Sequence, residues 1–127
     1  MKLLILGGTV FVGRHVVEAA LARGHEVALF NRGRQNAHLF PELEKLRGDR
    51  DGDLSVLRGR RFDAVIDVSG YTPTQVAATA AVLDVDHYTF ISSISAYRSY
   101  PPGRSYDEDA PLREGNDGYH ALKARAE

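Results

Sequence analysis

Short, nearly continuous apolar runs recur along the chain, and the segments between them carry apolar residues at helical spacing. A run without alternation is typical of a strand that is buried on both faces of a parallel sheet. We expect strands at residues 3–6, 25–30, 62–68 and 87–91, with a weaker strand at 44–46. Because helical segments alternate with these strands, the pattern predicts an α/β fold with a doubly wound parallel sheet of about five strands.

Three segments have helical patterns. The first begins at Phe11, after which apolar residues share one side. The second begins with Thr72 as the N-cap, Pro73 in the first turn and Gln75 reaching back, and it runs through residue 83. The third covers residues 119–127. A connector with a short helix is expected at 38–46, and an irregular loop at 98–118.

A glycine turn joins the first strand to the first helix. Gly7 and Gly8 permit a sharp turn without a Cβ, and Gly13 follows within the first helical turn. This arrangement directs the unpaired N–H groups of the helix, and the positive end of its dipole, at the loop. With the second strand, the unit has the length of half a dinucleotide site, although a tight turn in another kind of α/β protein would have the same pattern.

Composition sets limits on the function. The 127 residues suit one domain, 1–127, with a formal net charge of -1 that gives no global attraction for nucleic acid. The sequence has no cysteine, which excludes disulfides and cysteine-ligated metals, and we expect no metal site. No apolar run approaches the roughly 20 residues of a membrane span, so we expect a cytoplasmic protein with no membrane partner.

The end of the second strand predicts the choice of cofactor. An acid at this position would bind the ribose of NAD and repel an added phosphate, but the sequence has Asn31 followed by Arg32 and Arg34. Both arginines could form charge-assisted bonds to a 2′-phosphate. The pattern therefore favours NADP over NAD, unless these arginines are only solvated loop residues.

Polar and small residues follow the next two strands. Asp49 stands where an acid could contact adenine, and Asp53 could cap a short helix at 54–57. Ser69 and Gly70 end the 62–68 strand at the sheet edge where open α/β folds bind ligands. A basic cluster is also present and could contact RNA, although such a run is usually a solvated surface. It consists of Arg58, Arg60 and Arg61.

Candidate catalytic groups lie near the end of the chain. Tyr119 and Lys123 are four residues apart and share a helix face. A phenol with an ordinary pKa of about 10 is a poor base at neutral pH, and an adjacent ammonium stabilises its phenolate. Ser93 and Ser95 follow the 87–91 strand and could face the same crevice. An ordinary surface helix and a serine-rich loop are the alternatives.

Together these motifs resemble the extended and atypical short-chain dehydrogenase/reductase superfamily, in its NAD-dependent epimerase/dehydratase branch. The resemblance rests on GGTVFVG at 7–13, GDRDGD at 48–53, SSISAY at 92–97, DEDAP at 107–111 and YHALK at 119–123. It implies a Rossmann-type sheet, an NADP or NAD cofactor, and a nucleotide-sugar-like small molecule as substrate.

The resemblance also implies residue roles. Tyr119 would be the acid or base, Lys123 would assist it and hold the nicotinamide ribose, and Ser93, or else Ser95, would bind the substrate oxygen. The pyrophosphate would lie on Gly7, Thr9, Phe11, Val12 and Gly13. The adenosine ribose would contact Asn31 and Arg32, the adenine Asp49, and the middle of the cofactor Ser69 and Gly70.

Two departures from the family pattern matter. Val10 replaces a central glycine, as in a subgroup similar to chloroplast stem-loop RNA-binding proteins, so an RNA-binding or regulatory protein with a vestigial active site is the alternative function. The chain also lacks the family's later strands and substrate domain. We therefore expect an N-terminal portion with an uncovered fifth strand, weak cofactor binding and no turnover by itself, and a homo-oligomer is one way to cover that edge.

Overall fold

The computed structural model describes residues 1–99, 101–103, 105–115 and 118–126. Its strands form one parallel sheet in the order β3-β2-β1-β4-β5, which confirms the predicted Rossmann-type fold. The strands are β1 (Lys2–Leu6), β2 (Glu26–Asn31), β3 (Glu44–Arg47), β4 (Arg61–Asp67) and β5 (Asp84–Phe90). The helices are α1 (Phe11–Ala22), α2 (Pro73–Val82) and α3 (Tyr119–Ala126), with 3-10 turns η1 (Ser55–Leu57) and η2 (Ile94–Ala96).

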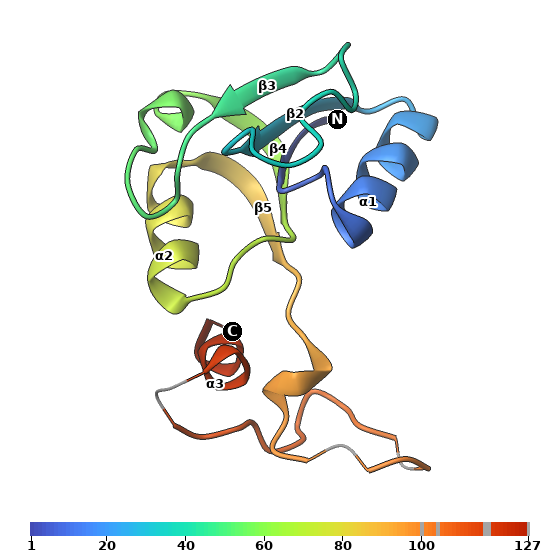
Figure 1. Cartoon of the computed structure of the whole chain (residues 1–127), viewed down its shortest axis with the longest axis vertical. Coiled ribbons are helices and arrows are strands. Elements are labelled where there is room, and N and C mark those ends of the chain that lie inside the picture. Colours follow the sequence, from blue (N-terminus) through green and yellow to red (C-terminus); the bar gives the residue numbers. More distant parts are fainter. Residues whose placement is uncertain (100, 104, 116–117, 127) are drawn as a thin grey trace.

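The central strand β1 explains the absence of alternation in the sequence. Its side chains point in turn to the two faces of the sheet, and both faces are covered by helices (Figure 1). Leu4 and Leu6 belong to the core cluster on the α2 side. Leu3 and Ile5 belong to the other, together with Val17 of α1. Because each strand residue faces one of two cores, the run is apolar throughout.

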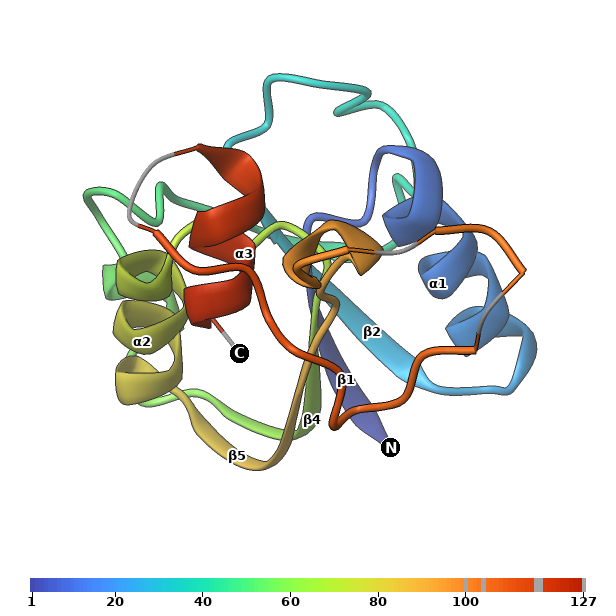
Figure 2. The ribbon, with the colours of Figure 1, turned by 90° about the horizontal axis from the view of Figure 1, so that it is seen from below.

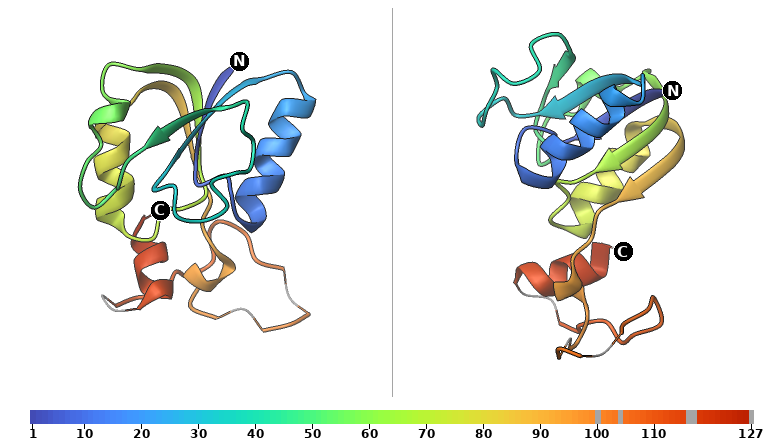
Figure 3. Two further views of the ribbon diagram at one scale, coloured as in Figure 1. Left: turned by 45° about the horizontal axis from the view of Figure 1, so that its top comes forward. Right: turned by 90° about the vertical axis from the view of Figure 1, so that its right-hand side faces the viewer.

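The described residues that follow β5 form a layer below the carboxyl ends of the strands. Figures 2 and 3 show α3 and η2 in this layer, with α3 beside α2. An irregular loop joins η2 to α3, as predicted for 98–118, apart from residues 100, 104, 116 and 117, which lie outside the described part. One antiparallel bridge, Tyr97 to Leu112, closes this loop on itself. Residue 127, the predicted end of the last helix, is also outside the described residues.

The start of the fifth strand and the short helix within 38–46 were predicted wrongly. The fifth strand begins at Asp84 rather than residue 87, because Arg61 on the neighbouring strand β4 pairs with both Asp84 and Asp86. These polar residues are therefore strand residues with exposed side chains, at a sheet edge. The short helix expected within 38–46 is absent: turns occupy this connector, closed by bonds from Leu39 N–H to the Asn36 carbonyl and from Leu43 N–H to the Phe40 carbonyl.

The predicted capping at α2 is confirmed. Thr72 Oγ1 accepts the Gln75 N–H at 3.2 Å, and Gln75 Oε1 accepts the Tyr71 N–H at 3.1 Å. The helix ends at Val82, one residue before the predicted end. Within the described parts of the chain, no helix has both the length and the apolar character that crossing a membrane requires.

Candidate functional site

The glycine turn between β1 and α1 has no room for side chains. Gly7 and Gly8 have φ values of +110° and +83°, which favour glycine. A Cβ at Gly7 would lie 2.6 Å from Val68 Cγ2, and one at Gly8 would lie 2.8 Å from Leu29 Cδ2. A Cβ at Gly13 would lie 2.7 Å from the Gly8 nitrogen. The first turn of α1 therefore packs directly on the loop that precedes it.

The amino end of α1 is left open for an anion. Val10 is the N-cap and offers no side-chain cap, and the first turn contains no acidic residue. The orphan N–H groups of this turn therefore have no carboxylate or hydroxyl cap from these positions. Because glycines line the approach and the helix dipole points at it, this end fits a diphosphate.

The departure at Val10 does not disturb the turn. Val10 has φ −136° and ψ 139°, an extended conformation that any residue adopts, and its side chain points outward with 49% exposure. The next residue, Phe11, has φ +40° and is 79% exposed. A left-handed phenylalanine with an exposed ring is unusual and marks this loop as a candidate contact surface.

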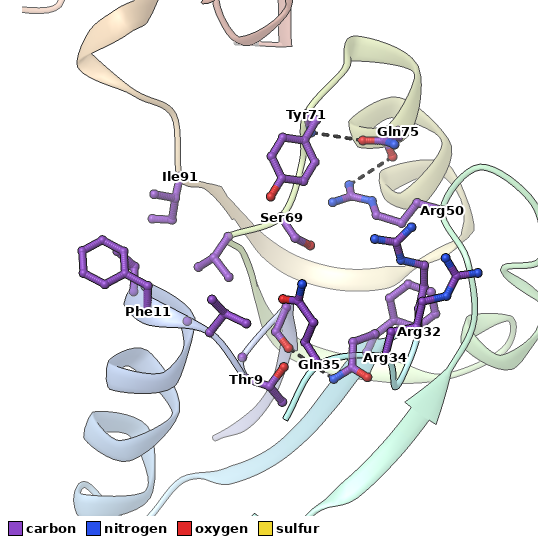
Figure 4. A pocket seen from close by; sticks show the side chains of 18 of the residues that line it. Thr9, Phe11, Arg32, Arg34, Gln35, Arg50, Ser69, Tyr71, Gln75 and Ile91 are labelled. Atoms are coloured by element: carbon purple, nitrogen blue, oxygen red, sulfur yellow. Dashed lines mark hydrogen bonds between the residues drawn. The ribbon is translucent and has the colours of Figure 1, made fainter. Parts of the chain in front are cut away.

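A cleft of about 820 Å³ opens at the carboxyl ends of the strands. It is lined by most of the predicted site residues, namely Gly7, Thr9, Phe11, Val12, Gly13, Asn31, Arg32, Asp49, Ser69, Ser93, Tyr119 and Lys123. In Figure 4, Arg32, Arg34 and Arg50 lie toward one end of this cleft, Phe11 and Ile91 toward the other, and Ser69 between them. We call these the adenosine end and the reaction end.

Two predicted residues are not in the lining. Gly70 is buried, and a Cβ there would lie 2.8 Å from both Phe90 Cε2 and Val76 Cγ2. Its small size therefore serves packing between α2 and β5. Ser95 also lies outside the lining, and its N–H is donated to Ser93 Oγ at 3.2 Å. Ser93 thus caps η2, and a hydroxyl that accepts one bond keeps its proton to donate.

Asn31 organises the loop at the adenosine end. Its side chain accepts the Gly33 N–H at 2.8 Å and donates to the Gly7 carbonyl at 3.4 Å. Asn36 donates to the Thr9 carbonyl at 2.9 Å, which fastens the same loop to the glycine turn. Arg32 and Arg34 extend from this loop into the cleft lining (Figure 4). This end therefore offers two guanidinium groups beside a rigid backbone.

A buried ion pair between Arg50 and Asp67 stands behind the adenosine end. Arg50 Nη1 and Nη2 donate to Asp67 Oδ1 and Oδ2, both at 2.7 Å. The Tyr88 hydroxyl donates to Asp67 Oδ2 at 2.7 Å, and burial, followed by the Asp67 charge, raises the pKa of Tyr88 far above the usual value for a phenol. The sequence alone does not predict this pair, because residues 17 positions apart on a loop and a strand leave no local pattern.

At the reaction end, Lys123 is nearly buried and lies among aromatic rings. Its Nζ donates to the Ile91 carbonyl at 2.9 Å and lies 4.4 Å from the Phe90 ring centroid. The Tyr119 and Tyr71 ring centroids are 6.0 and 5.9 Å from the same nitrogen. Tyr119 and Lys123 therefore share one face of α3 and face the cleft, as their spacing predicted.

Tyr71 is a second site residue that the sequence analysis missed. It follows Gly70 after β4, lines the cleft, and is 54% exposed. Its ring centroid lies 6.1 Å from that of Tyr119. Tyr71 directly follows Ser69 and Gly70 at the sheet edge where ligands were expected to bind, and this position could have identified it from the sequence.

The basic cluster is largely paired with carboxylates. Arg60 Nη1 lies 2.8 Å from Glu44 Oε1, and Arg61 bridges Asp84 and Asp86. All of these side chains are on the surface, so the pairs reduce the local positive charge without excluding a polyanion. The cluster does not contribute to the cleft lining.

Comparisons with known proteins agree with this architecture. Residues 3–72 match the NAD dependent epimerase/dehydratase family. The chain is 31% identical to chloroplast stem-loop binding protein of 41 kDa b from Arabidopsis thaliana, over 76% of this chain and 30% of that protein. It is 26% identical to UDP-glucose 4-epimerase from Neisseria meningitidis, over 99% of this chain and 46% of that protein.

Among solved structures, UDP-glucose 4-epimerase from Thermus thermophilus, in a complex with NAD, has the same fold. The TM-score is 0.71 at 22% identity, covering 98% of this chain and 48% of that one. The chain thus spans less than half the length of each of these three proteins. The family match at residues 3–72 covers more than half of this chain, and the chain therefore belongs to the NAD-dependent epimerase/dehydratase family.

Proposed function

We propose that this chain binds NADP, or less tightly NAD, as the cofactor-binding part of an epimerase, dehydratase or reductase that acts on a nucleotide-sugar-like substrate. The observation that carries the proposal is the junction of β1 and α1, where Gly7, Gly8 and Gly13 exclude side chains beside an uncapped helix end. The family's name and the nucleotide-sugar enzymes among its relatives support the substrate class.

The two ends of the cleft have different tasks in this proposal. The diphosphate lies on the backbone N–H groups of residues 9–13, and Asp49 contacts the adenine. Arg32 and Arg34 favour the 2′-phosphate of NADP through charge-assisted bonds. A bound nicotinamide would supply the hydride acceptor or donor next to Tyr119.

Proton transfer belongs to the residues of the reaction end. Tyr119 takes the proton of a substrate hydroxyl, and the nearby Lys123 ammonium stabilises the phenolate that performs this step. Ser93 donates a hydrogen bond to the same substrate oxygen as it becomes a carbonyl. Ser95, outside the cleft lining, is the weaker candidate for that role.

The test uses this chain and, for turnover, any longer form of the protein that its source produces. Wild type should quench or enhance NADPH fluorescence, and the longer form should interconvert or oxidise UDP-sugars. Tyr119→Phe should lower kcat by about 100-fold or more, the usual contribution of a general acid or base, and leave the Kd for NADPH within a factor of about two. NADPH binding without any change of UDP-sugars in the longer form would limit the proposal to cofactor binding.

A second candidate function is nucleic-acid binding with a vestigial reaction end. The 31% identity to a chloroplast stem-loop binding protein favours it, together with Val10 in place of the glycine. In a parallel titration with a fluorescent RNA stem-loop, saturable binding of the RNA without any binding of NADPH would support this function and contradict the first.

A further inference from the structure

We infer that the buried Arg50–Asp67 ion pair holds the adenosine end of the cleft in its binding shape before a cofactor arrives, so that Arg50 is a positioning residue for dinucleotide binding. The inference rests on the proposed function and goes beyond it. The pair joins two segments that line the cleft, the loop at 48–53 and the turn after β4 that contains Ser69.

Asp67 is a fully occupied acceptor. Its side chain is completely buried at the end of β4, and its two oxygens accept four hydrogen bonds. Two come from Arg50, one from the Tyr88 hydroxyl, and one from the Ser69 N–H at 3.0 Å. A buried carboxylate with all its lone pairs engaged fixes the direction of each donor. The turn at Ser69, in the middle of the cleft, is one of the groups fixed in this way.

Arg50 is similarly occupied from the other side. Its side chain is 8% exposed. Besides the two bonds to Asp67, Nε donates to Thr79 Oγ1 at 3.1 Å and Nη2 donates to the Gln75 carbonyl at 3.1 Å. Four of the five guanidinium N–H bonds that arginine carries are thus used inside the protein. We therefore assign Arg50 to shaping the cleft, whereas Arg32 and Arg34 remain for an anion.

Further hydrogen bonds hold the loop around Asp49, the proposed adenine contact, in a fixed shape. Gln75 Nε2 donates to both carboxylate oxygens of Asp51 at 2.9 Å. Within the loop, the Asp49 N–H is donated to the Asp53 carbonyl and the Gly52 N–H to the Asp49 carbonyl, both at 3.1 Å. Asp49 consequently lies in a loop whose next two residues, Arg50 and Asp51, are both hydrogen-bonded to α2.

Stability alone does not account for such a pair. A buried ion pair gains little over apolar residues of similar volume, because both charges lose their hydration. A rigid, prearranged site does gain affinity, because the ordering cost is met during folding and not during binding. The two roles therefore separate: apolar replacement should restore stability but leave the loop without its fixed shape.

The experiment compares Arg50→Met with a triple variant, Arg50→Met, Asp67→Leu and Tyr88→Phe, in which apolar groups replace the network. Arg60→Met is the matched control, because it removes an arginine and an exposed ion pair away from the cleft. Arg50→Lys keeps the charge without the paired bonds. The Kd for NADPH and for adenosine 2′,5′-bisphosphate, the urea midpoint, and ligand-free hydrogen exchange at residues 49–53 are measured for each.

We expect Arg50→Met to raise the Kd for both ligands by about 10- to 100-fold, as for lost bonds to a charged group, and to speed exchange at Gly52. The triple variant should regain most of the urea midpoint but not the affinity, and Arg50→Lys should be intermediate. Arg60→Met should match wild type. If Arg50→Met binds as tightly as wild type, or if affinity returns with stability in the triple variant, the inference is wrong and the proposed function stands. If wild type binds neither ligand, both fail.

Discussion

The adenosine end and the reaction end of the cleft are held in place in different ways. At the adenosine end, the lining residues directly follow β2 and β3, and the glycine turn beside them follows β1; side chains of all three strands belong to the two cores. At the reaction end, Tyr119 and Lys123 lie on an eight-residue helix that follows an irregular loop. A part-buried hydrogen bond from Lys123 to the carbonyl of Ile91, the residue after β5, connects that helix to the sheet.

This difference indicates how the two ends depend on the fold. The first should survive changes that leave both the sheet and the Arg50–Asp67 ion pair intact, since strand ends cannot move without disturbing the core. The second depends on a helix too short to be stable alone, so its order comes from the contacts of Ala121, Lys123 and Ala124. Variants can therefore disrupt one end without the other.

The largest effect is expected for Gly13→Glu. The new Cβ would lie 2.7 Å from the Gly8 nitrogen, and the carboxylate would compete for the helix end that should bind the diphosphate. We expect the Kd for NADPH to rise by about 100-fold or more, from charge repulsion and lost N–H contacts together. Gly24→Asn is the control, because a Cβ there meets nothing within 4 Å, asparagine tolerates the left-handed φ of +73°, and Gly24 lies outside the cleft lining. Unchanged NADPH binding in a folded Gly13→Glu protein would contradict this prediction.

Lys123→Met should disrupt only the reaction end. The variant loses the bond to the Ile91 carbonyl and the contact with the Phe90 ring. Amide exchange at Leu122, whose N–H is donated to the Gly118 carbonyl, should accelerate by about 10- to 100-fold, as for one lost bond from a charged group. The Kd for adenosine 2′,5′-bisphosphate should stay within a factor of about two. A large loss of affinity for this ligand would show that the two ends are coupled.

The double variant Arg32→Ser and Arg34→Ser tests whether these two arginines distinguish NADPH from NADH at the adenosine end. Both residues line the cleft, and Figure 4 shows them near Gln35. We expect the double variant to bind NADPH about 10-fold more weakly, while its Kd for NADH changes little, because only NADPH carries the 2′-phosphate. Equal losses for both cofactors would mean that the arginines attract anions without reading the ribose.

The smallest effect concerns Asp53, at the far edge of the 48–53 loop. Hydrogen bonds from the Ser55 hydroxyl and the Ser55 N–H hold the pKa of Asp53 below 3.8, the ordinary value. Because the folded pKa is lowered, the ionised Asp53 carboxylate stabilises the fold at pH values above its ordinary pKa. This contribution is lost as the pH falls through the folded pKa. Ser55→Ala should raise the pKa of Asp53 toward 3.8, measured from its carboxyl carbon shift, without changing NADPH affinity at pH 7. A pKa unaffected by Ser55→Ala would contradict this assignment.

Elements with a local sequence pattern could be predicted from the sequence, whereas contacts between distant segments could not. β1, β2 and β4 were predictable because burial on two faces favours apolar residues at most of their positions. The first residues of β5 include Asp84 and Asp86, which are typical of a loop in the sequence. Their place in a strand becomes clear only from their ion pairs with Arg61 on β4. Arg50–Asp67 could not be predicted for the same reason, since its partners meet only when the loop folds onto the sheet. Tyr119 and Lys123 were predictable as a pair because helical spacing alone places them on one face.

The most direct test of the central claim is an NMR titration of the wild-type chain with NADPH, following the backbone amides of residues 7–13. We expect saturable shifts at Thr9 to Gly13 that fit one binding event, a smaller shift at Gly52, and no such shifts in the Gly13→Glu protein. If NADPH at millimolar concentration leaves these amides unmoved, or shifts only residues outside the cleft, then the glycine turn does not bind the diphosphate and the account is wrong.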